Sequence, residues 1–411
     1  MTTKRLFRQI HLWLSVPFGI ILTLICFSGA ALIFETEITE ALRSDLYTTH
    51  KPAPDARPLP ISQLARRVAA TLPDSVRLTG VSIAPGDAGR TYLFSLSKPR
   101  RAAVAVDPYT GEVRGRTSRL PFFATMFSLH RWLLDGMKPG GGMSVGKLVV
   151  GISTLAFVFV LISGIVVWWP RTRRALTESL RLKFGPRRFH LWHSLHVAGG
   201  MYALIFLLAM ALTGLTWSFG WYRTGFYALF GIEQSAGGGH GAPAASDKGR
   251  DGNGEKGGGK KKGDGKNGRK SSDGKQAERA GHSDVPAAQA CFSQWQKVYE
   301  TLASHRPDAR LITIGDGTAT VASARYGNTR ATDRYTYDPV NGRITEATLY
   351  AEAKPVAKMR GWIFAVHTGS FGGIVTRILA FAAALLGATL PLTGYYLWLR
   401  RLHAKRRRRR N

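Results

Sequence analysis

The chain has 411 residues, of which 57 are Lys or Arg and 26 are Asp or Glu, and its formal net charge is +31. Such a charge is common in nucleic-acid-binding proteins, but here the basic residues gather beside long apolar runs, as in the cytoplasmic loops of membrane proteins. The distribution therefore argues against a nucleic-acid partner. Two cysteines without a CxxC spacing argue against a disulfide framework and against a thiolate metal site.

The first element is an apolar run over residues 10–34, which follows a basic N-terminus at residues 1–9. A helix needs about 20 apolar residues to cross a bilayer, so this run predicts a first transmembrane helix. The run is too long for the apolar region of a cleaved signal peptide, which has roughly 7–15 residues. It begins near His11 and contains the small-residue pair Ser28-Gly29.

The first long connection, residues 35–144, has the pattern of a small α+β domain. Apolar residues alternate along TYLFSLSKPRRAAVAV, and Asp107-Pro108 with Gly111 follows, so this stretch predicts strand, turn, strand. A helix is expected before it, from Ile61 to Leu72. The connection leads into the next apolar run through LHRWLLDG, which contains His130.

The second and third apolar runs cover residues 145–169 and 193–219 and predict two further transmembrane helices. The loop between them, residues 170–192, is rich in arginine, and the tryptophans just before it suit an aromatic belt at a membrane interface. Each run contains a small-residue pair, Ser163-Gly164 in the second and Thr213-Gly214 in the third.

The second long connection, residues 220–373, repeats the signals of the first. RYTYDPVNGRITE predicts strand, turn, strand, with a helix from Phe292 to Leu302 before it. A Gly/Lys-rich insert at residues 236–284 has almost no large apolar side chains, so we expect it to be disordered. The connection also contains His367, in VHTGSFGG.

The fourth apolar run covers residues 374–399, includes Thr393-Gly394, and ends at a basic tail, residues 400–411. The elements predict an α-helical membrane protein with four transmembrane helices and two small α+β domains, in which one half repeats the other. The basic segments are expected to stay in the cytoplasm together with both termini. The two domains would then lie in the periplasm, outside a bacterial inner membrane.

Four histidines recur at matching positions in the two halves. His11 and His196 each begin a span near the cytoplasmic face, and each is followed by a glycine at the same offset. His130 and His367 each precede a span near the outer face. Ionisable residues at such depths are costly and usually functional. Two imidazoles per face are what a six-coordinate haem b needs as axial ligands, so the pattern predicts two haems.

The ligand in the third span remains open between three histidines. The spacing to glycine favours His196, whereas the likeness of HLWHS at 190–194 to HLWLS at 11–15 favours His190, and His193 lies between them. These three do not suit zinc, because residues three apart rotate around a helix and no cysteine or carboxylate pair completes the site. The alternative to haem binding is that the histidines are hydrogen-bonding anchors at the membrane interface.

Several motifs together resemble the PepSY-associated transmembrane helix family: AVDPYTGEV, YDPVNGRI, SLHRWLLDG, ISGIVVWWPR, AVHTGSFGG and LTGYYLWLRR. The resemblance covers the chain except for the Gly/Lys-rich insert and the basic tail. It implies PepSY folds for both outer domains and kinship with FoxB-like ferric-siderophore reductases of the inner membrane, which have two haems. By position, His130 and His367 would bind the outer haem iron, and His11 and His196 the inner one.

These observations predict a haem-dependent transmembrane oxidoreductase that passes electrons from the cytoplasmic side to a periplasmic acceptor, a ferric siderophore. The chain has no GxGxxG that opens a helix after a strand, so the expected donor is a quinol or a separate cytoplasmic reductase. The alternative is a non-enzymatic PepSY module that binds a peptide or regulates a protease. A metal permease is disfavoured, because the spans contain no buried carboxylate pair.

Overall fold

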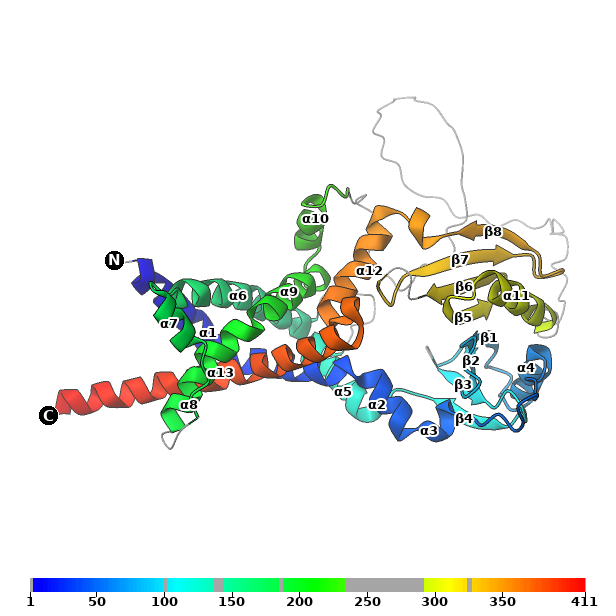
Figure 1. Ribbon diagram of the computed structural model, residues 1–411, viewed down its shortest axis with the longest axis horizontal. Helices are drawn as coiled ribbons and strands as arrows, with labels where there is room; N and C mark the ends of the chain where they lie inside the picture. The colour runs from blue at the N-terminus through cyan, green and yellow to red at the C-terminus, as the bar shows by residue number, and fades with distance from the viewer. Residues whose placement is uncertain are drawn as a thin grey trace, which may run out of the picture. The chain divides into compact units, whose positions relative to one another are not determined.

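The computed structural model describes residues 3–99, 102–136, 144–184, 188–233, 292–323 and 327–410 (Figure 1). The predicted disordered insert, residues 236–284, lies outside these ranges. Four helical segments are long and apolar enough to cross a membrane: Thr3–Ile33, Val145–Trp168, Phe189–Ser218 and Ser370–Arg407. They confirm the four predicted spans and make the chain a multi-pass membrane protein.

The spans consist of α1 (Thr3–Ile33), α6 (Val145–Trp168), α8 (Arg188–Ser194) continued by α9 (Gly200–Ser218), and α13 (Gly373–Arg410). A π-helical turn, η1 (Leu195–Gly199), joins α8 to α9 within the third span. Helices α1 and α9 each pack against both α6 and α13. The core between them is apolar and includes the buried Leu207 and Leu215.

Two short helices that the sequence analysis did not predict carry the outer histidines. Helix α5 (Pro121–Trp132) contains His130 and packs against α1 and α6, and α12 (Pro355–Thr368) contains His367 and packs against α9. Both helices end in a left-handed residue, Leu133 with φ 49° and Gly369 with φ 72°. Such a C-cap ends the helix, so the chain can change direction before the following span begins.

The remaining short helices connect the spans to the strands or to each other. They are α2 (Glu35–Leu42), α3 (Ser44–Tyr47), α7 (Arg173–Ser179) and α10 (Gly220–Ala228), with the 3₁₀ turns η2 (Tyr350–Glu352) and η3 (Ser370–Gly372).

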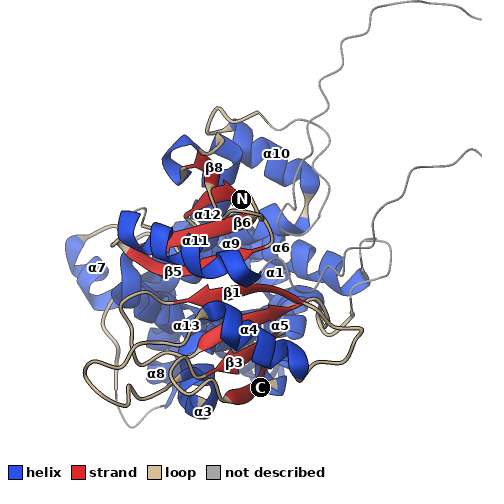
Figure 2. Ribbon diagram, turned by 90° about the vertical axis from the view of Figure 1, so that its right-hand side faces the viewer, coloured by secondary structure: helices blue, strands red, loops and turns tan. Residues whose placement is uncertain are grey.

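The strands form one antiparallel sheet of eight, in the order β4-β3-β2-β1-β5-β6-β7-β8. Helices α4 (Ile61–Ala70) and α11 (Phe292–His305) cover one face of it (Figure 2) and share its hydrophobic core. The strands are β1 (Leu78–Ile83), β2 (Tyr92–Leu96), β3 (Ala103–Val106), β4 (Val113–Thr117), β5 (Ala309–Gly315), β6 (Thr318–Ser323), β7 (Thr332–Tyr337) and β8 (Ile344–Thr348).

The two predicted strand–turn–strand units are present as β3–β4 and β7–β8. In the first turn, Asp107 Oδ1 accepts a hydrogen bond of 2.9 Å from the backbone N–H of Tyr109, and Gly111 has φ 73°. In the second turn, Asp338 Oδ1 accepts one of 2.8 Å from Val340, and Gly342 has φ 70°. Aspartate therefore stabilises the start of each turn, and glycine provides the positive φ near its end.

The structure differs from the prediction of two separate small domains. Strand β1 of the first half pairs with β5 of the second, with Gly80 opposite Gly315. A Cβ on Gly80 would lie 2.5 Å from the carbonyl oxygen of Ile314, so this close approach requires glycine. Each half contributes one helix and four strands, and pairing their inner edge strands leaves one sheet and one core.

Candidate functional site

The first candidate site is a pair of histidines on neighbouring spans. His11 lies in α1 and His196 in the π-helical turn η1, and the centroids of their rings are 6.3 Å apart with the planes at 88°. His190 and His193 are exposed, and their rings contact Phe189. The structure thus brings His196 to His11, and it places the two alternative histidines elsewhere.

Each inner histidine is oriented by the next helix. Nδ1 of His11 lies 3.0 Å from the carbonyl oxygen of Val160, and Nδ1 of His196 lies 3.1 Å from that of Leu390. A carbonyl oxygen only accepts hydrogen bonds, so Nδ1 must carry the proton in both rings. The neutral rings then keep the lone pair on Nε2, which is the arrangement of a histidine that binds a metal through Nε2.

The second candidate site is built in the same way from the two short helices. The ring centroids of His130 and His367 are 6.1 Å apart, with an interplanar angle of 59°. His130 Nδ1 lies 2.9 Å from the carbonyl oxygen of Ile25 in α1, and His367 Nδ1 lies 3.0 Å from that of Met210 in α9. The indole of Trp217 meets the His367 ring edge-on at 5.1 Å.

All four histidines sit on the same local pattern of a neighbouring helix. The pattern is a carbonyl that faces Nδ1, a Ser or Thr three residues later, and a glycine four residues later that faces Cε1. Its members are Val160, Ser163 and Gly164 for His11; Leu390, Thr393 and Gly394 for His196; Ile25, Ser28 and Gly29 for His130; and Met210, Thr213 and Gly214 for His367.

The pattern explains the small-residue pairs of the sequence. The hydroxyls of Ser163, Thr393 and Thr213 lie 2.9–3.2 Å from the Nδ1 that each faces. A Cβ added to Gly29 would lie 2.8 Å from His130 Cε1, and at the other three glycines the distance is 3.2–3.4 Å. Each glycine therefore makes room for an imidazole of another helix, and at three of the four sites the hydroxyl also helps to fix the tautomer.

Burial keeps the outer histidines, which lie outside the four spans, in the neutral form. Burial lowers the pKa of His130, and the positive charge of Arg131 adds to that effect. Burial lowers the pKa of His367 to about 3, and repulsion from His130 and Arg131 contributes. Neutral imidazoles are the form in which histidine binds a metal.

A comparison with protein families places this arrangement in a known group. The family model described as the PepSY-associated TM region matches residues 8–401. The chain belongs to this family. The matched part of this PepSY-associated TM protein includes all four paired histidines. No curated protein matches the sequence.

The pairs fit haem iron better than an ion that needs a cluster of ligands. Metal–imidazole bonds are about 2 Å long, so a metal ion between two imidazoles brings the ring centroids to roughly 6 Å. Both pairs have that separation. Within the described residues, no group of three His, Cys, Asp or Glu could hold a metal ion. Each pair thus presents two imidazoles that would suit a haem iron, which binds two such rings when six-coordinate.

Sequence reasoning missed the partners of the histidines. The carbonyls of Ile25, Val160, Met210 and Leu390 have no signal in the sequence, because any residue supplies one. The hydroxyl and glycine beside them are visible as the repeated Ser/Thr-Gly pairs. The position of Trp217 beside His367 carries no sequence signal that distinguishes it from an interfacial tryptophan.

Proposed function

We propose that this PepSY-associated TM protein is a di-haem oxidoreductase that carries electrons from the cytoplasmic side of a bacterial inner membrane to a periplasmic acceptor. The observation that supports it is the pairing of four histidines into two sites, each ring with Nδ1 held by a helix carbonyl. When bound, haem b supplies one-electron redox chemistry at each site.

The chain's own residues have defined roles in this proposal. His11 and His196 would bind the inner haem iron through Nε2, and His130 and His367 the outer one. A carbonyl opposite Nδ1 holds each ring in the metal-binding tautomer, and a hydroxyl assists it at His11, His196 and His367. The glycines opposite Cε1 let the imidazoles lie close to the neighbouring helix.

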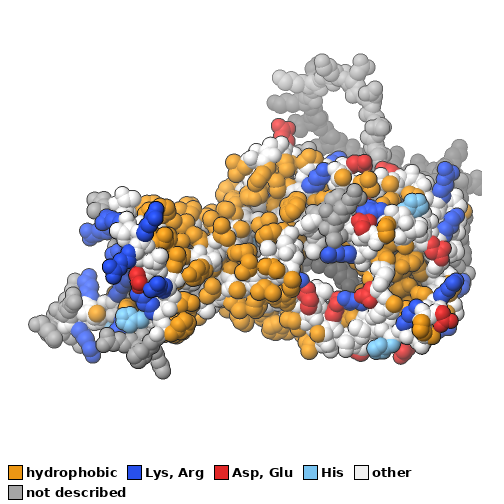
Figure 3. Space-filling model, in the orientation of Figure 1, with side chains coloured by type: hydrophobic (Ala, Val, Ile, Leu, Met, Phe, Trp, Pro, Cys, Tyr) orange, Lys and Arg blue, Asp and Glu red, His pale blue; other side chains and the backbone are white. Residues whose placement is uncertain are grey.

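The orientation follows from the basic residues. Lys and Arg gather at the end of the helical region where α7, α8 and the C-terminal part of α13 lie (Figure 3). The positive-inside rule then puts this end and both termini in the cytoplasm, and the sheet in the periplasm. The two halves would descend from a duplication, since each has two spans, four strands and one helix that covers the sheet.

The donor and acceptor are proposed by chemical class. A quinol or a separate cytoplasmic reductase would give up electrons near His11 and His196. A ferric siderophore on the periplasmic side would accept one electron per iron, so that Fe(III) becomes Fe(II). No side chain needs to act as an acid or a nucleophile in that transfer, because the protein only positions the cofactors and the acceptor.

The decisive experiment is spectroscopic. Purified protein should be red, and dithionite should produce the α and Soret bands of reduced six-coordinate haem. Anaerobic addition of a ferric siderophore should then re-oxidise the protein and yield Fe(II). Colourless protein that instead binds a peptide or regulates a protease would support the non-enzymatic PepSY module and overturn the proposal.

A further inference from the structure

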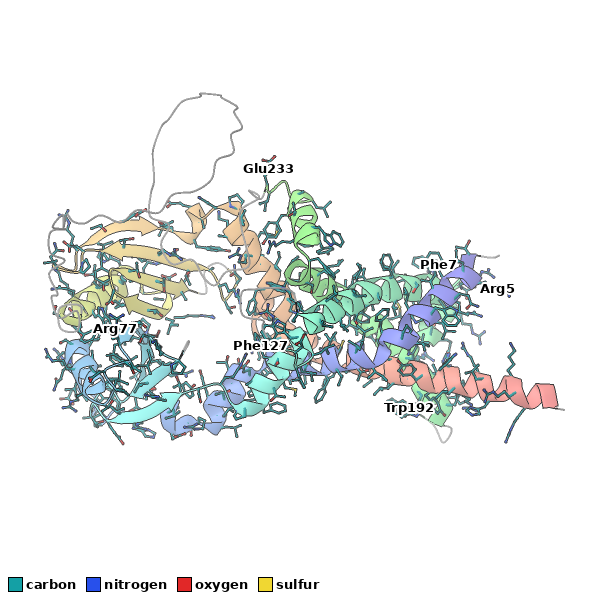
Figure 4. The ribbon with its side chains drawn as sticks, turned by 180° about the vertical axis from the view of Figure 1, so that it is seen from behind. Arg5, Phe7, Arg77, Phe127, Trp192 and Glu233 are labelled. Carbon is teal, nitrogen blue, oxygen red and sulfur yellow. The ribbon has the colours of Figure 1, made fainter. Side chains whose placement is uncertain are left out.

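A cavity of about 610 Å³ lies between the N-terminal end of α1 and the C-terminal end of α6. Three of its six lining residues are apolar, and none is acidic. The lining residues are Thr3, Lys4, Ile165, Val166, Trp169 and Arg171. Figure 4 shows Arg5 and Phe7 at the same end of α1.

The two cations of the cavity are exposed and come from separate segments. Lys4 Nζ donates a hydrogen bond of 3.1 Å to the carbonyl oxygen of Trp169, which leaves its other two protons for a ligand. Arg171 lies three residues after the end of α6. Ile165 and Val166 form the apolar side, and the Trp169 side chain is 62% exposed beside them.

The corresponding region of the second half has different side chains. Phe189 precedes His196 by the same number of residues as Lys4 precedes His11. The guanidinium of Arg400 lies 4.1 Å from the centre of the Phe189 ring, and the rings of Trp192 and Tyr396 are 6.3 Å apart. Aromatic packing thus occupies this region in the second half, whereas the first half presents Lys4 beside a cavity.

We propose that this cavity is a binding site for an anionic phospholipid. The phosphate would sit between Lys4 and Arg171, and an acyl chain would run along Ile165, Val166 and Trp169. Two cations above an apolar wall match an anionic headgroup above its chain. A quinol fits less well, because its oxidation releases protons and none of the six lining residues is a carboxylate or an imidazole. The inference does not rest on the proposed redox function.

The lipid site is adjacent in sequence to a residue that faces the inner histidine pair. Ile165 follows Gly164, and a Cβ added to Gly164 would lie 3.4 Å from His11 Cε1. A lipid bound against Ile165 and Lys4 would hold the ends of α1 and α6 together, next to the helix contact that orients His11.

The test is native mass spectrometry of the full chain in detergent that contains phosphatidylcholine. Phosphatidylglycerol is added in increasing amounts, and the bound lipid is measured. We expect one phosphatidylglycerol to bind tightly to the wild type. The double variant Lys4→Gln/Arg171→Gln should bind it about 30-fold more weakly, since each cation near the surface contributes about 1 kcal/mol. The matched control, Arg173→Gln/Arg174→Gln, removes two exposed cations outside the cavity and should leave the affinity unchanged.

Four results would overturn the site. The control could weaken binding as much as the cavity variant, which would mean general attraction to a basic surface. Phosphatidylcholine could bind as tightly as phosphatidylglycerol, or inorganic phosphate could displace the lipid at equal affinity. Either result would show that the site does not bind an anionic headgroup and an acyl chain of the same molecule. A ubiquinone analogue that displaces the lipid and binds the double variant normally would assign the cavity to a quinone.

Discussion

The imidazole of His130 lies directly against the backbone of Gly29. A Cβ at Gly29 would come within 2.8 Å of His130 Cε1 and 3.1 Å of Nδ1. The ring cannot simply turn away, because its Nδ1 is held by the carbonyl of Ile25 one turn earlier in the same helix. At Gly164 the same construction gives 3.4 Å to His11 Cε1, a distance closer to ordinary contact.

Gly29→Ala should therefore displace His130 and empty the outer site. We expect haem content to fall by about half, with the remaining haem showing the inner spectrum. Gly164→Ala is the matched control, because its methyl needs a shift of only a few tenths of an ångström. It should keep both haems. Equal haem content in the two variants, measured per mole of protein, would contradict the role assigned to Gly29.

The hydroxyl of Thr393 should tune the inner site without creating it. Its Oγ1 lies 2.9 Å from His196 Nδ1, while the carbonyl of Leu390 supplies a second acceptor. Thr393→Val keeps the volume of the side chain and removes one of the two hydrogen-bond acceptors of His196 Nδ1. Haem affinity should therefore fall about tenfold. Thr389→Val removes a hydroxyl that only bonds within its own helix, to Leu386.

Transfer of haem to apomyoglobin measures the difference between these two variants. Faster loss of haem in Thr393→Val than in Thr389→Val is the expected result. The same loss rate in both variants would show that the Thr393 hydroxyl does not support His196.

The sequence predicted the spans and the pairing of histidines by face, but it did not show what the small-residue pairs contact. The matching offsets of His11 to Gly29 and of His196 to Gly214 only align the two halves of the chain. In the structure Gly29 faces His130, and His11 faces Gly164. An equal offset shows only that two residues occupy matching positions in the two halves. Which residues touch depends on which helices pack together.

The joined sheet was beyond sequence reasoning for a related reason. Alternation along β1 and β5 predicts strands, but it does not say which edges meet, since any exposed edge offers the same backbone groups. The only sequence feature of the described strands that we connect with the junction is the pair of glycines, Gly80 and Gly315. Short loops identified the hairpins β3–β4 and β7–β8 because their turn residues lie within one motif.

Gly80→Ala should weaken the junction between the two halves of the sheet. Its methyl would lie 2.5 Å from the Ile314 carbonyl oxygen, so the strands must separate, at a cost of about 1–3 kcal/mol. The denaturation midpoint of the sheet should fall, while haem content stays unchanged because the histidines lie on other elements.

The matched control for the sheet is Gly225→Ala in α10. A Cβ there meets nothing within 4 Å, and alanine favours a helix by about 1 kcal/mol over glycine. Its midpoint should stay or rise. A midpoint for Gly80→Ala equal to that of the wild type would show that β1 and β5 do not pair as described.

The orientation predicts where reporters become active. Alkaline phosphatase fused after residue 45 should be active, because the proposed orientation puts the sheet that follows this position in the periplasm. A fusion near residue 180, in the basic loop, should be inactive, and a green fluorescent protein placed there should fluoresce. The opposite pattern at both positions would invert the protein in the membrane and reverse the proposed direction of electron flow.

The haem-to-protein ratio of the purified chain tests the central claim most directly. We predict two haems per wild-type chain, and about one after His11→Ala, His196→Ala, His130→Ala or His367→Ala, because each site loses one of its two axial ligands. His190→Ala and His193→Ala are the controls, since both side chains are exposed, and they should keep two. Wild-type protein without haem, or an unchanged ratio in all four paired-histidine variants, would contradict the account.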